Sequence, residues 1–323
     1  MKLIIQVPCF NEAGTLALTL RDLPREMPGF DIVEWLLIND GSTDDSVAIA
    51  RECGIDHIVS FSGNTGLARA FIAGIDAAIR LGADVIVNTD ADNQYLAADI
   101  PLLLAPILAG EADMVIGARP ISDIETFSAT KKLLQRIGSA VVRFVSKTGI
   151  PDAPSGFRAM TRDAAIRFNV FNEFTYTLET IIQAGQKGIA IKSVPIRVNG
   201  ELRPSRLMKS TWSYIRKSIV TMVRIFVVYK AFRFFMSVGL IVSGLGMLGG
   251  GRFLYYYFAG DGNGHIQSLI LSSVLLGIGF QTMLTAFLAD LLAVNRRLME
   301  DVQYRVKRLE IGQYAPPAPS GQP

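Results

Sequence analysis

Two aspartates, Asp90 and Asp92, stand two residues apart where an apolar run ends, in the stretch VIVNTDADNQY. The run 85–87 is typical of a short buried strand. If the chain stays extended beyond it, Asp90, Asp92 and Gln94 point to one face, because side chains alternate along a strand. Two carboxylates on one face repel each other unless a cation lies between them. Such oxygen ligands suit Mg²⁺ or Mn²⁺, and the alternative is a solvated loop that caps the next helix.

The first 117 residues alternate between strand and helix patterns. Segments rich in Ile and Val predict strands at 3–8, 34–40, 57–61, 84–90 and 113–119. Helical patterns lie between them at 12–23, 44–54, 66–82 and 96–110. This alternation predicts an α/β fold with a mostly parallel sheet covered on both faces. The polar clusters CFNE, NDGSTDD and NTDADNQ all follow predicted strands, where ligands of such sheets bind.

The composition points to a membrane protein rather than an ordinary soluble enzyme. Half of the 323 residues are hydrophobic, the formal net charge is +3 and the mean hydropathy is +0.33. Two uncharged runs, 234–251 and 266–289, predict transmembrane helices at about 234–258 and 266–290, with buried core helices as the alternative. The apolar run at the N-terminus is too short for a signal peptide, so we expect the first two-thirds to stay in the cytosol. Cys9 and Cys53 do not suggest a disulfide framework, and two histidines exclude a His-rich metal site.

A basic segment precedes the first apolar run. Residues 192–233 carry many Lys and Arg and a single acid, Glu201. From Trp212 to Phe226 apolar residues recur at helical spacing, which indicates an amphipathic helix in the lipid headgroup plane; packing on the catalytic domain is the alternative. Nucleic acid is a poorer partner, because the basic segment leads straight into lipid. Cations flank the two runs on their outer sides, so we expect a multi-pass protein of the plasma (inner) membrane with both termini cytoplasmic.

These patterns divide the chain into four parts. We expect a catalytic domain at 1–208 and basic amphipathic juxtamembrane helices at 209–232. Two transmembrane helices should follow within 233–294, and a cytoplasmic helix with a disordered tail within 295–323.

The motifs together resemble family 2 glycosyltransferases of the GT-A fold. Those motifs are VPCFNEAGTL, NDGSTDDS, GNTGLARA, DADNQ, SGFRAM and RPSR. Their order along nearly the whole chain is similar to that of the polyisoprenyl-phosphate glycosyltransferases, the group of dolichol-phosphate mannose synthases and bacterial undecaprenyl-phosphate enzymes. The chain departs from the pattern at Asn39, where an aspartate is common.

The resemblance implies a role for each matching residue. The donor nucleotide would be held by Pro8, Asn11, Glu12, Asp40, Asn64, Gly66 and Asp90. Asp90, Asp92 and Gln94 would bind Mg²⁺ or Mn²⁺ and the diphosphate, and Asp90, Asp92 and Arg119 would be catalytic. The acceptor phosphate would be held by Ser155, Gly156, Arg158, Arg203, Ser205, Arg206 and Lys209. Glu179 would orient an arginine or line the acceptor pocket, or else lie on a helix surface, and His57 would be structural.

The chemistry agrees with an inverting transfer from a nucleotide-sugar, UDP- or GDP-linked, to polyprenyl monophosphate. A lipid phosphate has a second pKa of about 6, as phosphorylated side chains do, and so is largely a dianion that needs no base. One rival is a transferase with a hydroxyl acceptor or a processive polysaccharide synthase, but the chain lacks the Q-x-x-R-W motif of such synthases. Another is an inactive membrane scaffold, which would not need a costly carboxylate pair. Membrane lipids are expected partners, and a homo-oligomer and a downstream flippase or lipid-linked-sugar transferase are candidates.

Overall fold

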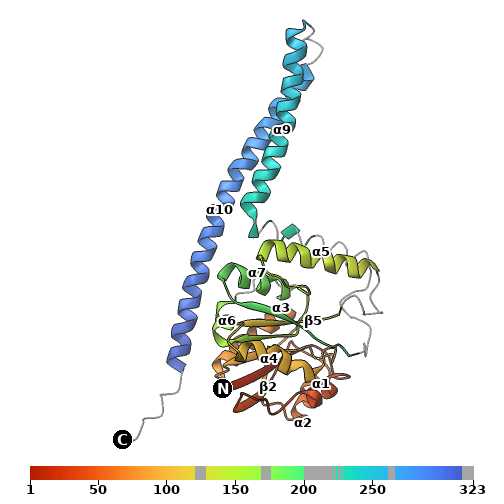
Figure 1. Ribbon diagram of the computed structural model, residues 1–323, viewed down its shortest axis with the longest axis vertical. Coiled ribbons are helices and arrows are strands. Elements are labelled where there is room, and N and C mark those ends of the chain that lie inside the picture. The colour runs from red at the N-terminus through yellow and green to blue at the C-terminus, as the bar shows by residue number, and fades with distance from the viewer. Residues whose placement is uncertain are drawn as a thin grey trace. The chain divides into compact units, whose positions relative to one another are not determined.

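The computed structural model describes residues 1–120, 129–168, 176–199, 229–260 and 266–314, together with 220, 223, 224 and 227 (Figure 1). The chain forms two compact units. One unit comprises Met1–Ile215 and Val302–Pro323, and the other comprises Arg216–Asp301.

The first unit is built on a seven-stranded sheet of order β3-β2-β1-β4-β6-β5-β7. Its strands are β1 (Lys2–Cys9), β2 (Ile32–Asn39), β3 (His57–Ser60), β4 (Val85–Asn88), β5 (Met114–Ala118), β6 (Arg158–Thr161) and β7 (Ile191–Pro195). Strands β1 to β4 pair in parallel, as do β5 and β7, whereas β6 runs antiparallel between β4 and β5. The predicted α/β fold with a mostly parallel sheet is therefore confirmed.

Helices connect these strands and cover the sheet. They are α1 (Leu16–Asp22), α2 (Ser46–Glu52), α3 (Leu67–Arg80), η1 (Ala97–Asp99), α4 (Ile100–Leu108), α5 (Ala129–Ser146), α6 (Arg162–Arg167) and α7 (Thr177–Lys187). Strand β1 is buried on both faces because helices lie on each side. Leu3 and Ile5 belong to a core shared with α1 and α4. The alternate residue Gln6 faces α3, where a side chain at Gly74 would collide with it.

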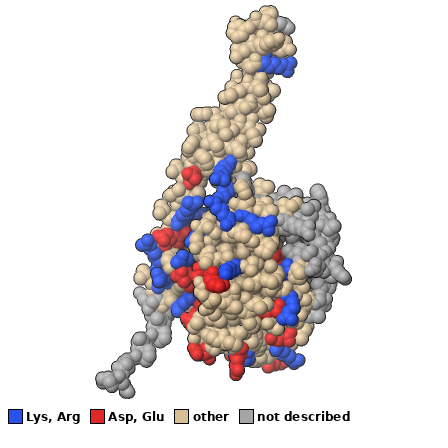
Figure 2. Space-filling model, viewed as in Figure 1, with Lys and Arg blue, Asp and Glu red and all other residues tan. Residues whose placement is uncertain are grey.

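The second unit contains two long apolar helices. Helix α9 (Ala231–Phe258) has 28 residues, and α10 (Ile266–Tyr314) has 49 and extends into the first unit. Each is long and apolar enough to cross a membrane, since about 20 residues span a hydrocarbon core of ~30 Å. Most of their large apolar side chains are exposed, Leu248 among them at 74%. The upper part of the helix pair in Figure 2 shows few charged residues, whereas charged residues gather along its lower part. Helix α10 runs without a break into the segment 295–323, where a cytoplasmic helix was expected.

Small residues let α9 and α10 approach closely. A Cβ at Gly239 would lie 2.6 Å from Cγ of Met283 and 2.9 Å from the carbonyl oxygen of Gly279. A Cβ at Gly279 would in turn lie 2.7 Å from the backbone nitrogen of Ser243. Close packing of this kind is the usual basis of helix association in lipid, where burial of apolar surface provides little drive.

Several predicted features lie outside the described residues. They are most of the predicted basic helix at 209–232, the acceptor-site residues Arg203, Ser205, Arg206 and Lys209, and the tail at 315–323.

Candidate active site

The loops after β1 and β2 form one hydrogen-bonded surface at the carboxyl end of the sheet. The parallel register pairs Cys9 with Asn39, so the chains that follow start side by side. Asn11, with a φ of 55°, accepts the backbone N–H of Thr43 on Oδ1 at 2.8 Å. Its own N–H donates to Oγ of Ser42 at 2.9 Å, and the N–H of Glu12 donates to Oγ of Ser46 at 2.9 Å. Two predicted donor-site residues, Asn11 and Glu12, thus stand in a preformed loop, while Pro8 is buried within β1.

Asp40, a predicted donor-site residue, follows β2 directly. Its side chain is buried, and its two carboxylate oxygens accept hydrogen bonds from the backbone N–H groups of Thr65 and Gly66 at 2.7 and 2.9 Å. It also accepts the hydroxyl of Thr65 at 2.7 Å. The carboxylate thus holds the loop that carries exposed Asn64, and the predicted contact of Asp40 with the donor stays a prediction.

Glycine is required where these two loops meet. Gly41 has a φ of +74°, a left-handed conformation that side chains disfavour, and a Cβ there would lie 2.8 Å from the backbone nitrogen of Asn64. The loops after β2 and β3 are thereby in direct contact.

The metal loop, Asp90–Gln94, is a turn and not the extended chain that the alternation argument assumed. Ala91 and Asp92 lie in the turn, and Asn93 has a φ of 56°. The backbone N–H of Gln94 donates to Oδ1 of Asp92 at 3.1 Å, a local bond that favours the turn over a strand. Asp90, Asp92 and Gln94 are each half-buried, so all three remain accessible to a small ligand.

The electrostatics of the metal loop suit a cation. Burial, and next the charge of Asp92, raise the pKa of the Asp90 carboxyl to about 7, although Arg119 and Arg158 oppose the shift. A group that is disfavoured as an anion by a like charge is stabilised when a divalent ion binds both. Within the described residues no three His, Cys, Asp or Glu side chains form a metal cluster. The donor set fits an ion that completes its shell with waters and phosphates, as Mg²⁺ usually does.

Arg119 is held by a carboxylate that the sequence interpretation missed. Its Nε and an Nη donate to Asp152 at 2.8 and 3.0 Å, and its backbone N–H donates to the same carboxylate at 3.1 Å. Both side chains are buried. A fork of this kind fixes the plane of the guanidinium and leaves its charge close enough to lower the pKa of Asp90. Asp152 is visible in the sequence as the aspartate of PDAPSGF, but no local sequence pattern links that aspartate to Arg119.

Gly156 lies directly against Asp90. A Cβ at Gly156 would lie 3.1 Å from both carboxylate oxygens of Asp90 and 2.9 Å from the hydroxyl of Tyr176. The Gly156 carbonyl accepts Nδ2 of Asn88 at 2.8 Å, and its N–H donates to the hydroxyl of Tyr95 at 2.9 Å. The predicted acceptor-site residue Gly156 therefore packs against Asp90, a predicted metal ligand.

Arg158, a predicted acceptor-site residue, lies in the protein interior. Its side chain is fully buried beneath the site, and its guanidinium lies 5.2 Å from the ring centroid of Tyr176. Its Nη atoms donate to Oγ1 of Thr180 at 2.6 Å, to the carbonyl of Thr177 and to that of Ser155. The guanidinium is thus not presented to an incoming phosphate. Ser155 is also buried, and its hydroxyl has no hydrogen-bond partner within the described residues.

Two further residues have clear positions. His57 lies at the first residue of β3, at the opposite edge of the sheet from the site, and its Nε2 is 2.7 Å from Oε2 of Glu34. Its predicted structural role agrees with that position. Glu179 on α7 is 8% exposed, so it is not the surface carboxylate of the alternative interpretation.

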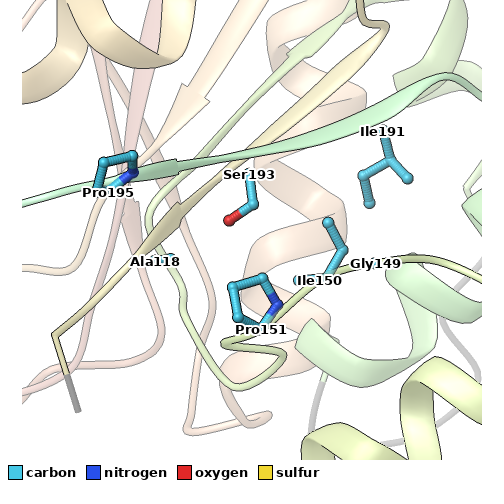
Figure 3. A pocket seen from close by; sticks show the side chains of 7 residues that line it. All are labelled: Ala118, Gly149, Ile150, Pro151, Ile191, Ser193 and Pro195. Atoms are coloured by element: carbon cyan, nitrogen blue, oxygen red, sulfur yellow. The ribbon is translucent and has the colours of Figure 1, made fainter. Parts of the chain in front are cut away.

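An apolar cavity of about 410 Å³ lies beside Ala118, the residue before Arg119. Figure 3 shows its lining, which is Ala118, Gly149, Ile150, Pro151, Ile191, Ser193 and Pro195. The hydroxyl of Ser193 donates to the carbonyl of Ile116 at 3.2 Å, so its polar atom is already engaged. No charged residue lines the cavity, and the sequence analysis assigned no function to the residues that line it.

The glycosyl transferase family 2 model matches residues 4–168, which include most of β1, all of β2 to β6 and every loop described above. The chain belongs to this family. It is accordingly a glycosyltransferase, and its fold is of the GT-A type.

Relatives of this glycosyltransferase share most of their length with it. It is 26% identical over 204 residues to the polyprenol monophosphomannose synthase of Mycolicibacterium smegmatis, covering 60% of this chain and 76% of that one. It is 28% identical over 218 residues to the undecaprenyl-phosphate mannosyltransferase of Micrococcus luteus, covering 64% and 88%. A crystal structure of glucosyl-3-phosphoglycerate synthase from Mycobacterium tuberculosis, with Mn²⁺ and UDP, has a TM-score of 0.56 at 19% identity, covering 70% and 78%. At that identity the structural likeness concerns the fold alone.

Proposed function

We propose that this glycosyltransferase moves a sugar from a nucleotide-sugar to a polyprenyl monophosphate at the cytoplasmic face of a membrane, with inversion at the anomeric carbon. The observation that carries the proposal is the metal loop: a half-buried carboxylate pair at the carboxyl end of β4, with Arg119 nearby and the loops after β1, β2 and β3 around it. Two relatives are named for polyprenyl-phosphate acceptors, and two helices are long and apolar enough to anchor the enzyme in lipid.

The donor would lie across the loops at the carboxyl end of the sheet. Asp90, Asp92 and Gln94 would hold a divalent ion, Mg²⁺ or Mn²⁺, which when bound neutralises charge on the departing nucleoside diphosphate. Arg119, fixed in orientation by Asp152, would place a permanent positive charge near the same oxygens. The preformed loop of Asn11 and Glu12 would receive the nucleoside.

The acceptor would be its own nucleophile. A phosphate monoester with a second pKa of about 6 is largely dianionic at pH 7, so no side chain has to remove a proton. Within the described residues the only histidine, His57, lies at the far edge of the sheet, which supports a reaction without a histidine base. Arg203, Arg206 and Lys209 follow in the sequence and would supply the cations that hold the phosphate.

A transfer assay with paired acceptors tests the proposal. Full-length enzyme in detergent is given radiolabelled UDP- and GDP-sugars with undecaprenyl phosphate, with undecaprenol or with no lipid. We expect transfer to the phosphate alone, its loss with EDTA and its recovery with Mg²⁺ or Mn²⁺. Asp92→Asn should be inactive, whereas the exposed carboxylate Asp22 can be changed to Asn as a control. Efficient use of the free alcohol would favour a base-assisted transferase, and no sugar consumption under any condition would favour a scaffold.

A further inference from the structure

The short segment that follows β7 lies along the metal loop. We name it the strap, residues 196–199. The backbone N–H of Ile196 donates to the carbonyl of Ala118 at 3.0 Å, which fixes one end of the strap beside Arg119. Arg197 donates two hydrogen bonds to the carboxylate of Asp99, from its backbone N–H at 2.7 Å and from its Nε at 3.0 Å. Val198 forms an isolated β-bridge with Tyr95.

The strap ends on the backbone of the metal loop itself. The N–H of Asn199 donates to the carbonyl of Gln94 at 2.9 Å, and its side-chain Nδ2 donates to the carbonyl of Asn93 at 3.0 Å. Asn93 has a positive φ, a left-handed conformation that asparagine tolerates better than most non-glycine residues. Asn199 therefore holds the end of the turn through two hydrogen bonds, one to the carbonyl of Asn93 and one to the carbonyl of Gln94.

The opposite side of the same turn has a separate support. The hydroxyls of Thr15, which directly precedes α1, and of Thr19 on α1 both donate to the carbonyl of Ala91 at 3.0 Å. Two carboxylates that repel each other would push the turn open when no cation is bound. The threonines hold only its Ala91 end. At the Asn93 end, the N–H of Gln94 donates to Asp92. The carbonyls of this end, those of Asn93 and Gln94, accept hydrogen bonds from the strap.

We infer that Asn199 is a positioning residue that keeps Asp92 and Gln94 at ligand spacing before the metal arrives. Asn199 is not itself a ligand: its amide acts through the Asn93 carbonyl and the turn. The inference rests on the proposed metal site. It predicts that weakening the strap lowers affinity for the ion while leaving recognition of the lipid acceptor unchanged.

The test is direct titration of full-length protein in detergent with Mn²⁺, read as free Mn²⁺ by electron paramagnetic resonance. Asn199→Ala removes the side-chain bond and keeps the backbone one. We expect Mn²⁺ binding to weaken about 3- to 10-fold, the change in an equilibrium constant that loss of one hydrogen bond produces. Asn199→Asp should weaken it at least as much, because a carboxylate cannot donate to the Asn93 carbonyl. Asn199→Ser, which keeps a short donor, should recover part of the loss.

Lys192→Ala is the matched control. Lys192 lies on β7, just before the strap, and its ammonium pairs at 2.8 Å with exposed Glu111, which is not part of the metal loop. It should bind Mn²⁺ as the wild type does. In transfer assays Asn199→Ala should need more Mn²⁺ for half-maximal rate at an unchanged KM for undecaprenyl phosphate, and saturating Mn²⁺ should restore kcat.

The outcomes separate the inference from the proposed function. If the wild type binds Mn²⁺ and Asn199→Ala binds it equally well, the strap does not position the ligands and the inference is wrong. A lower kcat that saturating Mn²⁺ does not restore would also overturn it, since that pattern indicates a general structural role. If the wild type itself binds no Mn²⁺, the metal site and the inference are both wrong.

Discussion

The residues of the candidate site fall into two groups: some have exposed polar atoms that a ligand could reach, and others are buried and hold neighbouring protein groups in place. Asp90, Asp92 and Gln94 are half-buried and open to an ion. Asp40, Asp152 and Arg158 carry charges of the kind that bind ligands, yet each is buried and engaged by neighbouring protein groups. Buried charges are costly unless paired, so their partners account for their presence. The motif residues are thus divided between contact and support.

Gly156→Ala tests the close packing of Gly156 against Asp90 of the metal loop. The added methyl group would lie 3.1 Å from the Asp90 carboxylate and 2.9 Å from the Tyr176 hydroxyl, so Asp90 has to move. We expect transfer activity to fall by more than about tenfold, a barrier increase above ~1.4 kcal/mol. Steady-state transfer at saturating Mn²⁺ measures this.

Gly149→Ala is the control for that prediction. Nothing lies within 4 Å of a Cβ at Gly149, and its φ is not in the left-handed region, so it should keep nearly full activity. Equal activity of the two variants would show that Asp90 tolerates displacement and that its position is not critical.

At the scale of elements, the α9–α10 pair depends on close approach at a few positions. Gly239 and Gly279 lie where a Cβ would collide with the partner helix. Gly244 lies on the same helix as Gly239, but a Cβ added there would have nothing within 4 Å. Glycines along one apolar helix therefore have unequal importance.

Gly239→Leu should separate the two helices. Overpacking of a tight contact costs about 1–3 kcal/mol, so we expect lower thermal stability of the hairpin in detergent. Disulfide cross-linking of cysteines placed on α9 and α10 should also slow. Gly244→Leu should leave both measurements unchanged, and an equal loss in the two variants would contradict a specific contact at Gly239.

At the scale of the whole molecule, the proposed activity joins a catalytic unit to a lipid substrate. Every described donor-site residue lies before Pro120, whereas the two apolar helices begin at Ala231. A glycosyltransferase that acts on a lipid phosphate has to work at the membrane surface, because the acceptor does not leave the membrane. Its nucleophile should then titrate as a phosphate and not as a side chain.

The pH dependence of transfer tests the nucleophile. Above about pH 6 the acceptor phosphate is a dianion, and it gains a proton as the pH falls through that value. We therefore expect kcat/KM for undecaprenyl phosphate to fall on the acid side of about pH 6. Binding of Mn²⁺ and nucleotide is measured at each pH as the control. A rate that stays constant down to about pH 5, with intact donor binding, would contradict a dianionic nucleophile.

The sequence alone determined the fold class, the family and the apolar helices. Strands rich in Ile and Val that alternate with helices predict a mostly parallel sheet. Long uncharged runs predict apolar helices without any information on tertiary contacts. Motif order located Asn11, Asp90 and Asp92 at the carboxyl ends of strands, because topology places all such ends at one edge.

Only the tertiary structure decided which of these side chains are exposed and which are buried. Asp152 meets Arg119 across 33 residues of sequence, and Asn199 meets Asn93 across 106, so no local pattern could have paired them. The alternation rule misplaced the metal loop because a hydrogen bond to the Asp92 side chain turns the chain where extension was assumed. Arg158 was assigned to the acceptor phosphate through its match to the SGFRAM motif, whereas its burial depends on the antiparallel strand β6 lying between β4 and β5. Residue types and spacing set the available chemistry, but long-range packing sets which of those groups are exposed.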